Sequence, residues 1–430
     1  FSAICKTRLN PSFAANRMKI LIPQSKERNV VAAVRSLGRA GHEVILGAPR
    51  SGPDIFRTRW ASGCVTIPSP YVSPEAYVDA LEDVLRREKF DVLLPFSHAA
   101  VLPVSYAYER LARWAAIPFP PYAVLRRAHD KLESMRLAQE VGVPIPATFW
   151  PEDEQALVKT LGEIPYPCLV KARQGCGIGT TIRFASTPQE LLAGYRAVSA
   201  QVSNPPVNDF SRPMIQEYIP GTLYDALFLY NHGQRRAAVA QVREVTYPLS
   251  GGTGARNRTI EDPELLELGG RILDVLGWHG PAQVEFMRDE RDGQLKLMEI
   301  NPKFWGTLAC SLRAGVDFAA LACEMAVQGD VAPHFDYTRD LTYRWILPDL
   351  WFAYWGAPRG TRWREVVGKG GPQVWDDMDW GDPMPNVDRL AYTIKTMGLH
   401  RERVLPAYFE LRTQALTRLP AVPAVLPPVQ

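Results

Sequence analysis

Residues 282–288 (AQVEFMR) and 294–306 (QLKLMEINPKFWG) carry the strongest structural signal in this chain. Apolar residues alternate with others in both segments, which is typical of β-strands, and the polar turn DERDG between them predicts an antiparallel hairpin. The hairpin places Glu285 beside Glu299. Asn301 shares a face with Glu299, because side chains alternate along a strand. Two carboxylates and one amide are therefore expected on one patch.

This patch predicts a site for a divalent cation. Neighbouring carboxylates repel each other unless a cation lies between them, so the pattern favours Mg²⁺, with phosphate oxygens of a ligand completing its coordination. A carboxylate without a partner in an apolar strand would be strongly unfavourable. Two alternatives stay open: the glutamates pair with Arg288 or Lys296, or one of them is protonated.

The chain before residue 119 alternates between predicted strands and helices. The strands are expected at residues 19–23, 44–47 and 91–95, and the helices at 29–40 and 76–89. Such βαβ units predict a parallel sheet with helices on both faces. The first strand is followed by PQSK and not by GxGxxG, so no dinucleotide site is expected there. His98 follows the strand at 91–95, where ligands of parallel sheets bind; it is a candidate for an acceptor pocket or a purely structural histidine.

From residue 120 the pattern changes to that of an α+β domain. The expected elements are a helix at 128–142, strands at 167–172 and within 214–221, and a hairpin that joins 223–230 to 237–245. Lys131 opens a helix, and Lys171 precedes a loop that contains Gly175, Gly177 and Gly179. Lysines near such a loop favour a polyphosphate, because glycines let backbone N–H groups approach its oxygens. The alternative is solvated lysines beside an ordinary turn.

Composition excludes several classes of protein. The 430 residues are too many for one typical core, and 46% hydrophobic with 22% charged residues is ordinary for a globular protein. The 49 basic and 46 acidic residues leave a net charge of +3, which argues against a nucleic-acid partner. The six cysteines have no CxxC spacing, and no apolar run approaches the ~18 residues of a membrane span. We expect a cytoplasmic protein with reduced thiols. Residues 1–17 lack a signal-peptide pattern and are expected to be a non-native or disordered leader.

In this order, the motifs resemble those of the ATP-grasp superfamily, specifically its carboxylate–amine ligase-like members, over about residues 18–330. The matching segments are HDKLES at 129–134, KARQGCGIG at 171–179, QEYIPG at 216–221, Arg243 with Gly251, Gly252 and Arg256, and EINPKFWG at 299–306 together with Glu285. The last string is the most specific of them.

The resemblance implies an α/β (α+β) architecture of the ATP-grasp type. A Rossmann-like domain would span residues 18–119, a lid subdomain 120–212, a catalytic subdomain 213–333 and an aromatic-rich extension 334–430. ATP would bind between the lid and catalytic subdomains.

The resemblance also implies roles for individual residues. Lys131, Lys171 and the loop with Gly175, Gly177 and Gly179 would contact the ATP phosphates. Glu217, Tyr218 and Ile219 would read the adenine, with Asp225 as a candidate for the ribose. Glu285, Glu299 and Asn301 would hold Mg²⁺ or Mn²⁺. Arg256, with Arg243 as a second candidate, would steady the transferring phosphoryl group. Lys303 stands where many relatives have arginine and would reach phosphate or a substrate carboxylate.

The activity implied is an ATP- and Mg²⁺-dependent ligation. A carboxylic acid would be activated as an acyl phosphate and joined to an amine, giving an amide or peptide bond. The expected partners are small amino acid-like substrates and a second copy of the chain, with no nucleic acid and no membrane. The alternatives are a carboxylase that uses bicarbonate, phosphoryl transfer to a stable product, and a catalytically silent nucleotide-binding scaffold.

Overall fold

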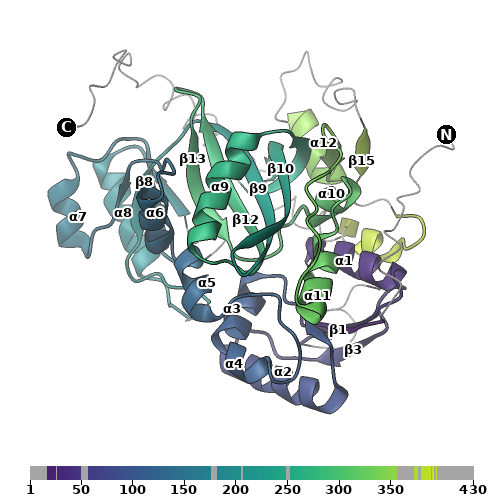
Figure 1. Cartoon of the computed structure of the whole chain (residues 1–430). Helices are drawn as coiled ribbons and strands as arrows, with labels where there is room; N and C mark the ends of the chain where they lie inside the picture. The colour runs from purple at the N-terminus through teal and green to yellow at the C-terminus, as the bar shows by residue number, and fades with distance from the viewer. Residues whose placement is uncertain are drawn as a thin grey trace.

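The computed structural model describes residues 17–25, 27–49, 57–175, 182–204, 207–247, 252–355, 372–375, 379–388, 390–391 and 394. These residues form three sheets (Figure 1). The predicted leader lies outside the described residues except for Arg17. Within the described part, no helix is both long enough and apolar enough to cross a membrane.

The N-terminal sheet confirms the predicted βαβ pattern. Its four strands are parallel in the order β3-β2-β1-β4. The strands are β1 (Lys19–Ile22), β2 (Glu43–Ala48), β3 (Gly63–Thr66) and β4 (Val92–Leu93). The helices of this region are α1 (Arg28–Arg39), α2 (Pro74–Glu88), α3 (His98–Tyr106) and α4 (Tyr108–Leu111). Helix α2 begins directly after Ser73, whose side chain accepts a hydrogen bond from the Ala76 N–H and so caps the helix.

The central sheet has seven strands in the order β13-β12-β9-β10-β11-β14-β15. They are β9 (Gly221–Asn231), β10 (Gln234–Tyr247), β11 (Thr253–Ile260), β12 (Gly280–Asp289), β13 (Leu295–Asn301), β14 (Thr342–Arg344) and β15 (Gln373–Trp375). Both predicted hairpins are confirmed, as β9–β10 and β12–β13, and β9 pairs with β12 to join them. The helices α9 (Pro263–Val275), α10 (Leu308–Arg313), α11 (Phe318–Gln328) and α12 (Ile346–Trp355) accompany this sheet.

A third, antiparallel sheet lies beside the central one. Its order is β5-β8-β6-β7, with β5 (Thr148–Phe149), β6 (Cys168–Lys171), β7 (Ile182–Ala185) and β8 (Met214–Glu217). Helices α7 (Glu154–Thr160) and α8 (Pro188–Ser199) pack with it on the side away from the N-terminal sheet (Figure 1). We call this sheet with α7 and α8 the lid unit.

The helix predicted at residues 128–142 is confirmed for residues 131–140, but it begins after Asp130 and not at Ala128. The chain forms two helices there, α5 (Tyr122–His129) and α6 (Lys131–Glu140), with Asp130 in an extended conformation between them. The Asp130 carboxylate accepts hydrogen bonds from the N–H groups of Leu132 and Glu133, which makes it the N-cap of α6. The side-chain bonds of Asp130 thus outweigh the continuous helical pattern.

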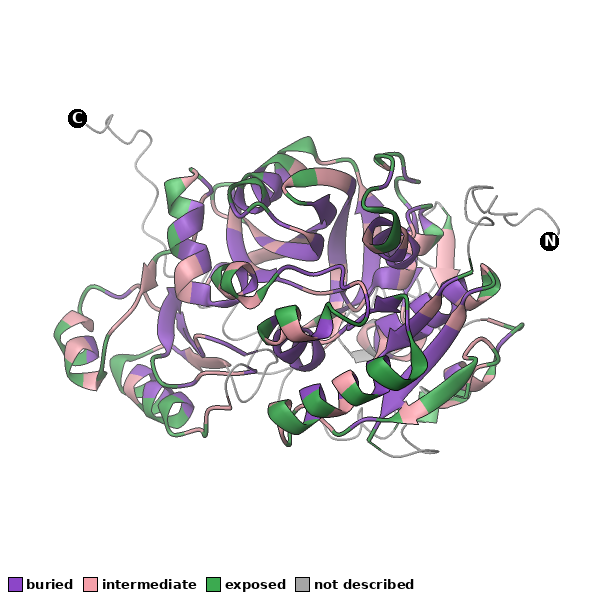
Figure 2. Cartoon of the chain, turned by 60° about the horizontal axis from the view of Figure 1, so that its bottom comes forward, coloured by how far each residue is buried: buried purple, intermediate pink, exposed green. Residues whose placement is uncertain are grey.

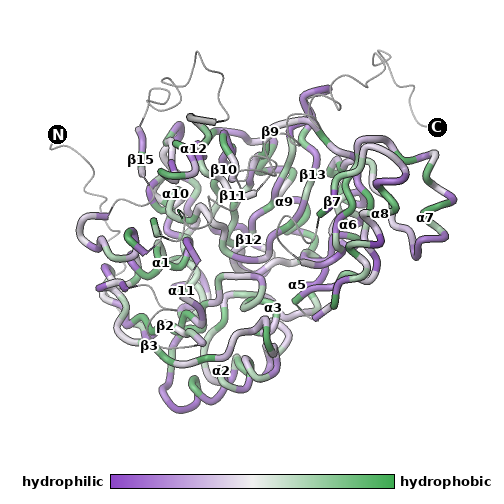
Figure 3. Tube along the Cα trace, turned by 180° about the vertical axis from the view of Figure 1, so that it is seen from behind, coloured by the Kyte–Doolittle hydropathy of each residue, from purple (hydrophilic) through white to green (hydrophobic). Residues whose placement is uncertain are grey.

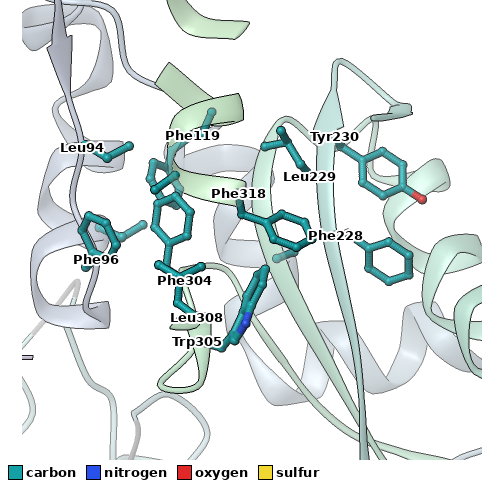
Figure 4. Packing of buried hydrophobic residues seen from close by; sticks show 14 of the residues in the cluster. Leu94, Phe96, Phe119, Phe228, Leu229, Tyr230, Phe304, Trp305, Leu308 and Phe318 are labelled. Carbon is teal, nitrogen blue, oxygen red and sulfur yellow. The ribbon is translucent and has the colours of Figure 1, made fainter. Parts of the chain in front are cut away.

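The N-terminal and central sheets share one apolar core, whereas the lid unit has its own. The shared core includes Leu21, Leu93 and Trp305, and Phe96 stacks on Phe304 with ring centroids 4.5 Å apart (Figure 4). The lid core contains Leu157, Val170, Leu191 and Ile215, among others. Buried strands and exposed outer helix faces recur in all three units (Figure 2), and the outer turns of α2 and α7 are hydrophilic (Figure 3). The lid unit is therefore packed independently.

The domain boundaries stay a prediction, but the sheet continues past residue 334. Strand β14 pairs with β11, so the expected extension contributes to the central sheet. Further on, residues 379–388 lie against the N-terminal unit: Arg35 Nε donates to Asp382 Oδ2 at 3.0 Å, and Thr58 Oγ1 donates to the same oxygen at 2.7 Å. The C-terminal part of the described chain thus holds the first and central units together.

Candidate functional site

Glu285, Glu299 and Asn301 come together as the hairpin predicts. Glu285 and Glu299 are directly opposite in the register of β12 and β13. The Asn301 Nδ2 group donates to Glu285 Oε1 at 2.9 Å and to Glu299 Oε1 at 3.1 Å. We call these three residues the acidic patch. Their gathering is confirmed, and their role as metal ligands stays a prediction.

The proposed pairing of these glutamates with Arg288 or Lys296 is wrong. Arg288 Nη2 donates to Asp262 Oδ2 at 2.7 Å, and Lys296 Nζ donates to Asp289 Oδ2 at 2.6 Å. Both cations lie toward the turn end of the hairpin, where Arg288 pairs with Asp262 at the start of α9 and Lys296 pairs with Asp289 of the hairpin itself. The partner of Glu285 is Arg243 of β10, with Nη2 2.5 Å from Glu285 Oε1.

Asp225 positions that arginine. It is fully buried on β9, opposite Glu285 in register. Its two carboxylate oxygens accept hydrogen bonds from Arg243 Nε at 2.9 Å and Nη2 at 2.6 Å, and Gln241 Nε2 donates at 2.8 Å. Because these bonds occupy the buried carboxylate, the structure explains Asp225 as the residue that orients Arg243. A contact of Asp225 with a ribose stays a prediction.

Lys131 reaches the acidic patch from the N-terminus of α6. Its Nζ lies 3.7 Å from Glu299 Oε2 and donates to the Gly175 carbonyl at 3.0 Å. Lys171, at the end of β6, donates to Gln216 Oε1 on β8 at 2.6 Å. Burial lowers the pKa of Lys171 to about 8, although Glu299 opposes the change. Both lysines are thus buried around Glu299 and not solvated.

The surroundings of the patch shift the pKa values of its two glutamates in opposite directions. For Glu299, burial would raise the pKa, but Lys131 and Lys171 outweigh it and lower the pKa below the ordinary value. For Glu285, burial is the largest cause and the pKa is raised, even though Arg243 opposes it. Glu299 is therefore the permanent anion of the pair, and Glu285 is the group that a further cation would help to ionise.

Asp130 is a buried residue of the candidate site that the sequence analysis missed. It is almost completely buried and accepts hydrogen bonds from Arg173 Nε at 2.8 Å and Gln174 Nε2 at 2.9 Å, besides capping α6. These bonds fix the start of the glycine-spaced loop beside Lys131. The segment Asp130 to Glu133, an Asp followed three residues later by Glu, is a capping signal that could have identified it.

Of the glycine-spaced loop, only its beginning is described. Gly175 has a φ of +133°, a conformation that side chains disfavour, and its carbonyl accepts from Lys131. Gly177 and Gly179 lie outside the described residues. Their predicted phosphate contacts stay predictions.

The predicted adenine-reading segment at Glu217, Tyr218 and Ile219 connects the lid unit to the central sheet. The Glu217 N–H donates to the Ala147 carbonyl at 2.8 Å, and the Tyr218 N–H donates to the Pro167 carbonyl at 3.1 Å. These two N–H groups are therefore used within the lid unit and are not donors to a base. The Glu217 carboxylate lies 2.5 Å from Arg291 Nη1 in the β12–β13 turn, which ties the segment to the hairpin.

Arg256 and Lys303 lie in different surroundings. Arg256 Nη2 is 2.7 Å from Asp349 of α12. Asn257 is opposite Arg243 in register, so strand alternation places the neighbouring Arg256 on the other face of the sheet from the acidic patch. The predicted contact of Arg256 with a phosphoryl group is therefore not supported. Lys303 acts electrostatically on Glu299, which places it near the patch.

The donor set of the patch is limited to a few oxygen atoms. Among the residues the structure describes, no group of three or more His, Cys, Asp or Glu side chains could hold a metal ion. A metal here would use two carboxylates, the Asn301 amide and oxygens from a bound ligand. Such hard oxygen donors suit Mg²⁺, which commonly binds through one or two carboxylates plus phosphate oxygens.

Sequence comparisons identify related proteins. Residues 209–347 match the family model described as "ATP-grasp in the biosynthetic pathway with Ter operon". A formate-dependent phosphoribosylglycinamide formyltransferase of Ignicoccus hospitalis is 27% identical over 167 residues, which are 37% of this chain and 40% of that protein. A D-alanine–D-alanine ligase of Pseudomonas entomophila is 25% identical over 282 residues, 62% of this chain and 84% of the ligase. The chain thus spans well under half of the formyltransferase.

Comparison with solved structures identifies the same fold. The biotin carboxylase domain of the 2-oxoglutarate carboxylase of Hydrogenobacter thermophilus has a TM-score of 0.60 at 16% identity, covering 76% of this chain and 74% of that domain. The L-amino acid ligase of Bacillus licheniformis has a TM-score of 0.57 at 17% identity, covering 73% and 75%. The family match over residues 209–347 and these likenesses in fold make the chain similar to ATP-grasp proteins, among them carboxylate–amine ligases.

Proposed function

We propose that this protein is an ATP- and Mg²⁺-dependent ligase that activates a carboxylic acid as an acyl phosphate and joins it to an amine. One observation carries the proposal: Glu285, Glu299 and Asn301 form a single patch that faces Lys131, with Lys171 electrostatically coupled to Glu299. Carboxylates to bind a cation and lysines to bind phosphates are the two requirements of a nucleotide-using ligase.

The residues present fit Mg²⁺. Glu285 and Glu299 are opposite each other with an amide between them, and burial keeps the pKa of Glu285 raised. A divalent cation would stabilise the ionised form of Glu285 and remove the repulsion between the two carboxylates. Mn²⁺ suits the same oxygen donors. When bound, such an ion neutralises charge on the phosphates.

The protein residues would mainly position the reactants and neutralise charge. Lys131 and Lys171 would bind phosphate oxygens, and Arg243, held by Asp225, would orient Glu285 and stabilise the developing charge of the acyl phosphate. The carboxylate oxygen of the acid would attack the terminal phosphorus of ATP, and ADP would leave. The amine would then attack the acyl carbon, and phosphate would leave. Phosphoryl transfer needs positioning and charge stabilisation more than a covalent residue.

The experiment is a coupled assay of ADP release with pairs of carboxylic acids and amines, taken from the twenty protein amino acids and simple aliphatic acids. We expect release that requires an acid, an amine and Mg²⁺ together, with mass spectrometry showing the amide product. Glu299→Gln should abolish release, whereas Glu267→Gln, on the exposed surface of α9, should leave it unchanged. Release that needs bicarbonate in place of the acid would instead support the carboxylase alternative. Absence of release with every pair would contradict ligation.

A further inference from the structure

The buried ammonium group of Lys171 has a single hydrogen-bond acceptor in the described part of the chain. Its Nζ atom donates to Gln216 Oε1 at 2.6 Å, and none of the described carboxylates forms an ion pair with it. Lys171 is only 6% exposed, and Gln216 is fully buried. A buried ammonium group needs acceptors, because the loss of its hydration is otherwise unfavourable. The other N–H groups of Lys171 can therefore serve a ligand.

The register of the lid sheet places Gln216 beside this lysine. Gln216 of β8 lies opposite Thr148 of β5 on one side and opposite Leu169 of β6 on the other. Lys171 follows Leu169 by two residues, so strand alternation puts its side chain on the same face of the sheet, diagonal to Gln216. Because both residues belong to the lid sheet, their contact is internal to the lid unit.

A chain of hydrogen bonds fixes the orientation of the Gln216 amide. Gln216 Nε2 donates to Thr148 Oγ1 at 3.2 Å, and Thr148 Oγ1 donates to the Pro146 carbonyl at 2.7 Å. A lysine ammonium group can only donate, so the amide oxygen must face Lys171 and the amide NH₂ group must face Thr148. The reversed amide would place a donor against a donor at the lysine. The chain of bonds therefore holds Oε1 where it orients the ammonium group.

The side chain that orients Lys171 is neutral, which matters for the charge of the site. A glutamate at this position would pair with the lysine and cancel its charge, whereas an amide oxygen orients the ammonium group without doing so. The charged groups that face Lys171 from other elements partly offset each other. Glu299 and Glu285 raise its pKa, and Lys131 lowers it. The positive charge of Lys171 is thus left to attract an anionic group of a ligand.

We propose that Gln216 is a positioning residue for Lys171: as a neutral acceptor, it orients the ammonium group and leaves its positive charge for the phosphates of the nucleotide. Thr148 supports this role because it fixes the Gln216 amide. The inference rests on the proposed function, since the anionic ligand is the ATP of that reaction.

Calorimetric titration of a non-hydrolysable ATP analogue with Mg²⁺ tests the role of the acceptor. Gln216→Met keeps the length of the side chain but removes the acceptor, so the Kd should rise about fivefold. Gln216→Glu should raise the Kd at least about tenfold although it keeps an acceptor, because its carboxylate competes with phosphate for Lys171. Gln155→Glu, the same substitution at an exposed position of α7 in the lid unit, is the matched control and should leave the Kd within about twofold.

A double variant tests whether Gln216 acts through Lys171. Added to Lys171→Ala, the Gln216→Met substitution should cause no further loss of affinity, because the group that Gln216 orients is already absent. A merely structural effect on the lid unit would add to the effect of Lys171→Ala.

A second substitution acts on the same chain of bonds more gently. Thr148→Val should raise the Kd about threefold, and Thr160→Val of α7 is its control and should leave the Kd unchanged. Melting temperatures show whether each variant is folded, and Thr148→Val replaces Gln216→Met in the comparison if the latter is not.

The possible outcomes separate the inference from the proposed function. An unchanged Kd in Gln216→Met, wild-type affinity in Gln216→Glu, or a full additional loss in the double variant would each overturn the inference while nucleotide binding stands. An unchanged Kd in Lys171→Ala would show that the phosphates lie elsewhere. A wild type that does not bind the analogue would contradict the proposed function. In these last two cases the inference fails as well.

Discussion

The two halves of the candidate site are built in different ways. The acidic patch lies on the central sheet, where register alone places Glu285 opposite Glu299, and the sheet shares its core with the N-terminal unit. Lys171 and the start of the glycine-spaced loop belong to the lid unit, which has a separate and much smaller core. The half proposed to bind the cation is thus fixed by the fold, and the half proposed to bind phosphate depends on how the lid unit is attached.

Polar contacts provide much of that attachment. Arg173 donates to Asp130, Lys131 donates to the Gly175 carbonyl, and Glu217 pairs with Arg291 of the β12–β13 turn. Polar pairs of this kind are individually weak compared with a shared apolar core. We therefore expect that the lid unit can open or unfold without unfolding of the central sheet.

The largest expected effect comes from the fixed half. Glu299→Gln removes the anion that Lys131 and Lys171 stabilise, so we expect turnover to fall at least about 100-fold, or about 3 kcal/mol in the barrier. The melting temperature should stay close to that of the wild type, because the side chain is held by register and not by packing. Near-normal turnover in steady-state assays would contradict the assignment.

The two cores should respond differently to the same truncation. Leu229→Ala in the shared core and Leu157→Ala in the lid core each remove a fully buried leucine side chain, at a cost of about 2–5 kcal/mol. We expect Leu229→Ala to increase hydrogen exchange throughout β9, β10 and β12. Leu157→Ala should increase it only within the lid unit, as mass spectrometry of peptides would show. If both substitutions increased hydrogen exchange over the same parts of the chain, the lid unit and the central sheet would unfold together.

A smaller effect is expected from the lid side of the site. Lys171→Ala removes one of the cations proposed to bind phosphate, so the Kd of a non-hydrolysable ATP analogue should rise about tenfold. Lys159→Ala, on α7 of the same unit, is the control and should leave this Kd unchanged. Calorimetric titration of the analogue into the wild type, Lys171→Ala and Lys159→Ala measures the three Kd values. An unchanged Kd for Lys171→Ala would mean that the phosphates lie elsewhere.

The smallest effect concerns pH. Burial lowers the pKa of His279 to about 4, so its contribution to stability is complete above about pH 6.5 and is lost as the pH falls toward 4. Between about pH 7.5 and pH 5.5 the unfolded state binds a proton that the folded state does not, which costs about 1 kcal/mol. We therefore expect His279→Gln to lose about 1 kcal/mol less than the wild type over this range in urea unfolding. The same loss in both proteins would show that His279 is solvated.

Much of the acidic patch was predictable, because it depends on local rules. Alternation along two strands and a short polar turn suffice to bring Glu285, Glu299 and Asn301 together. The partners of these residues were not predictable in the same way. Arg243 meets Glu285 only because β9 lies between β10 and β12, and strand order is a property of the whole sheet. The break at Asp130 was missed because the apolar periodicity runs through it. Its capping bonds from Leu132 and Glu133 are local, whereas its bonds from Arg173 and Gln174 involve residues far along the chain.

The surroundings of Arg256 could not be predicted from the sequence either. The family resemblance implied that it contacts the phosphoryl group, but the register shifts of β10 beside β11 and the alternation of side chains turn it toward Asp349 of α12. A helix that begins at Ile346 supplies this partner. Near a β-bulge, the side of the sheet on which a side chain lies depends on the register of both strands. A single sequence does not contain that register.

The central claim is that the acidic patch binds a divalent cation together with ATP. The most direct measurement is calorimetric titration of a non-hydrolysable ATP analogue into the wild type and into the Glu285→Gln, Glu299→Gln double variant, each with and without Mg²⁺. We expect Mg²⁺ to strengthen binding to the wild type at least about tenfold and to have little effect on the double variant. Equal dependence on Mg²⁺ in both proteins, or binding by the wild type that ignores Mg²⁺, would contradict it.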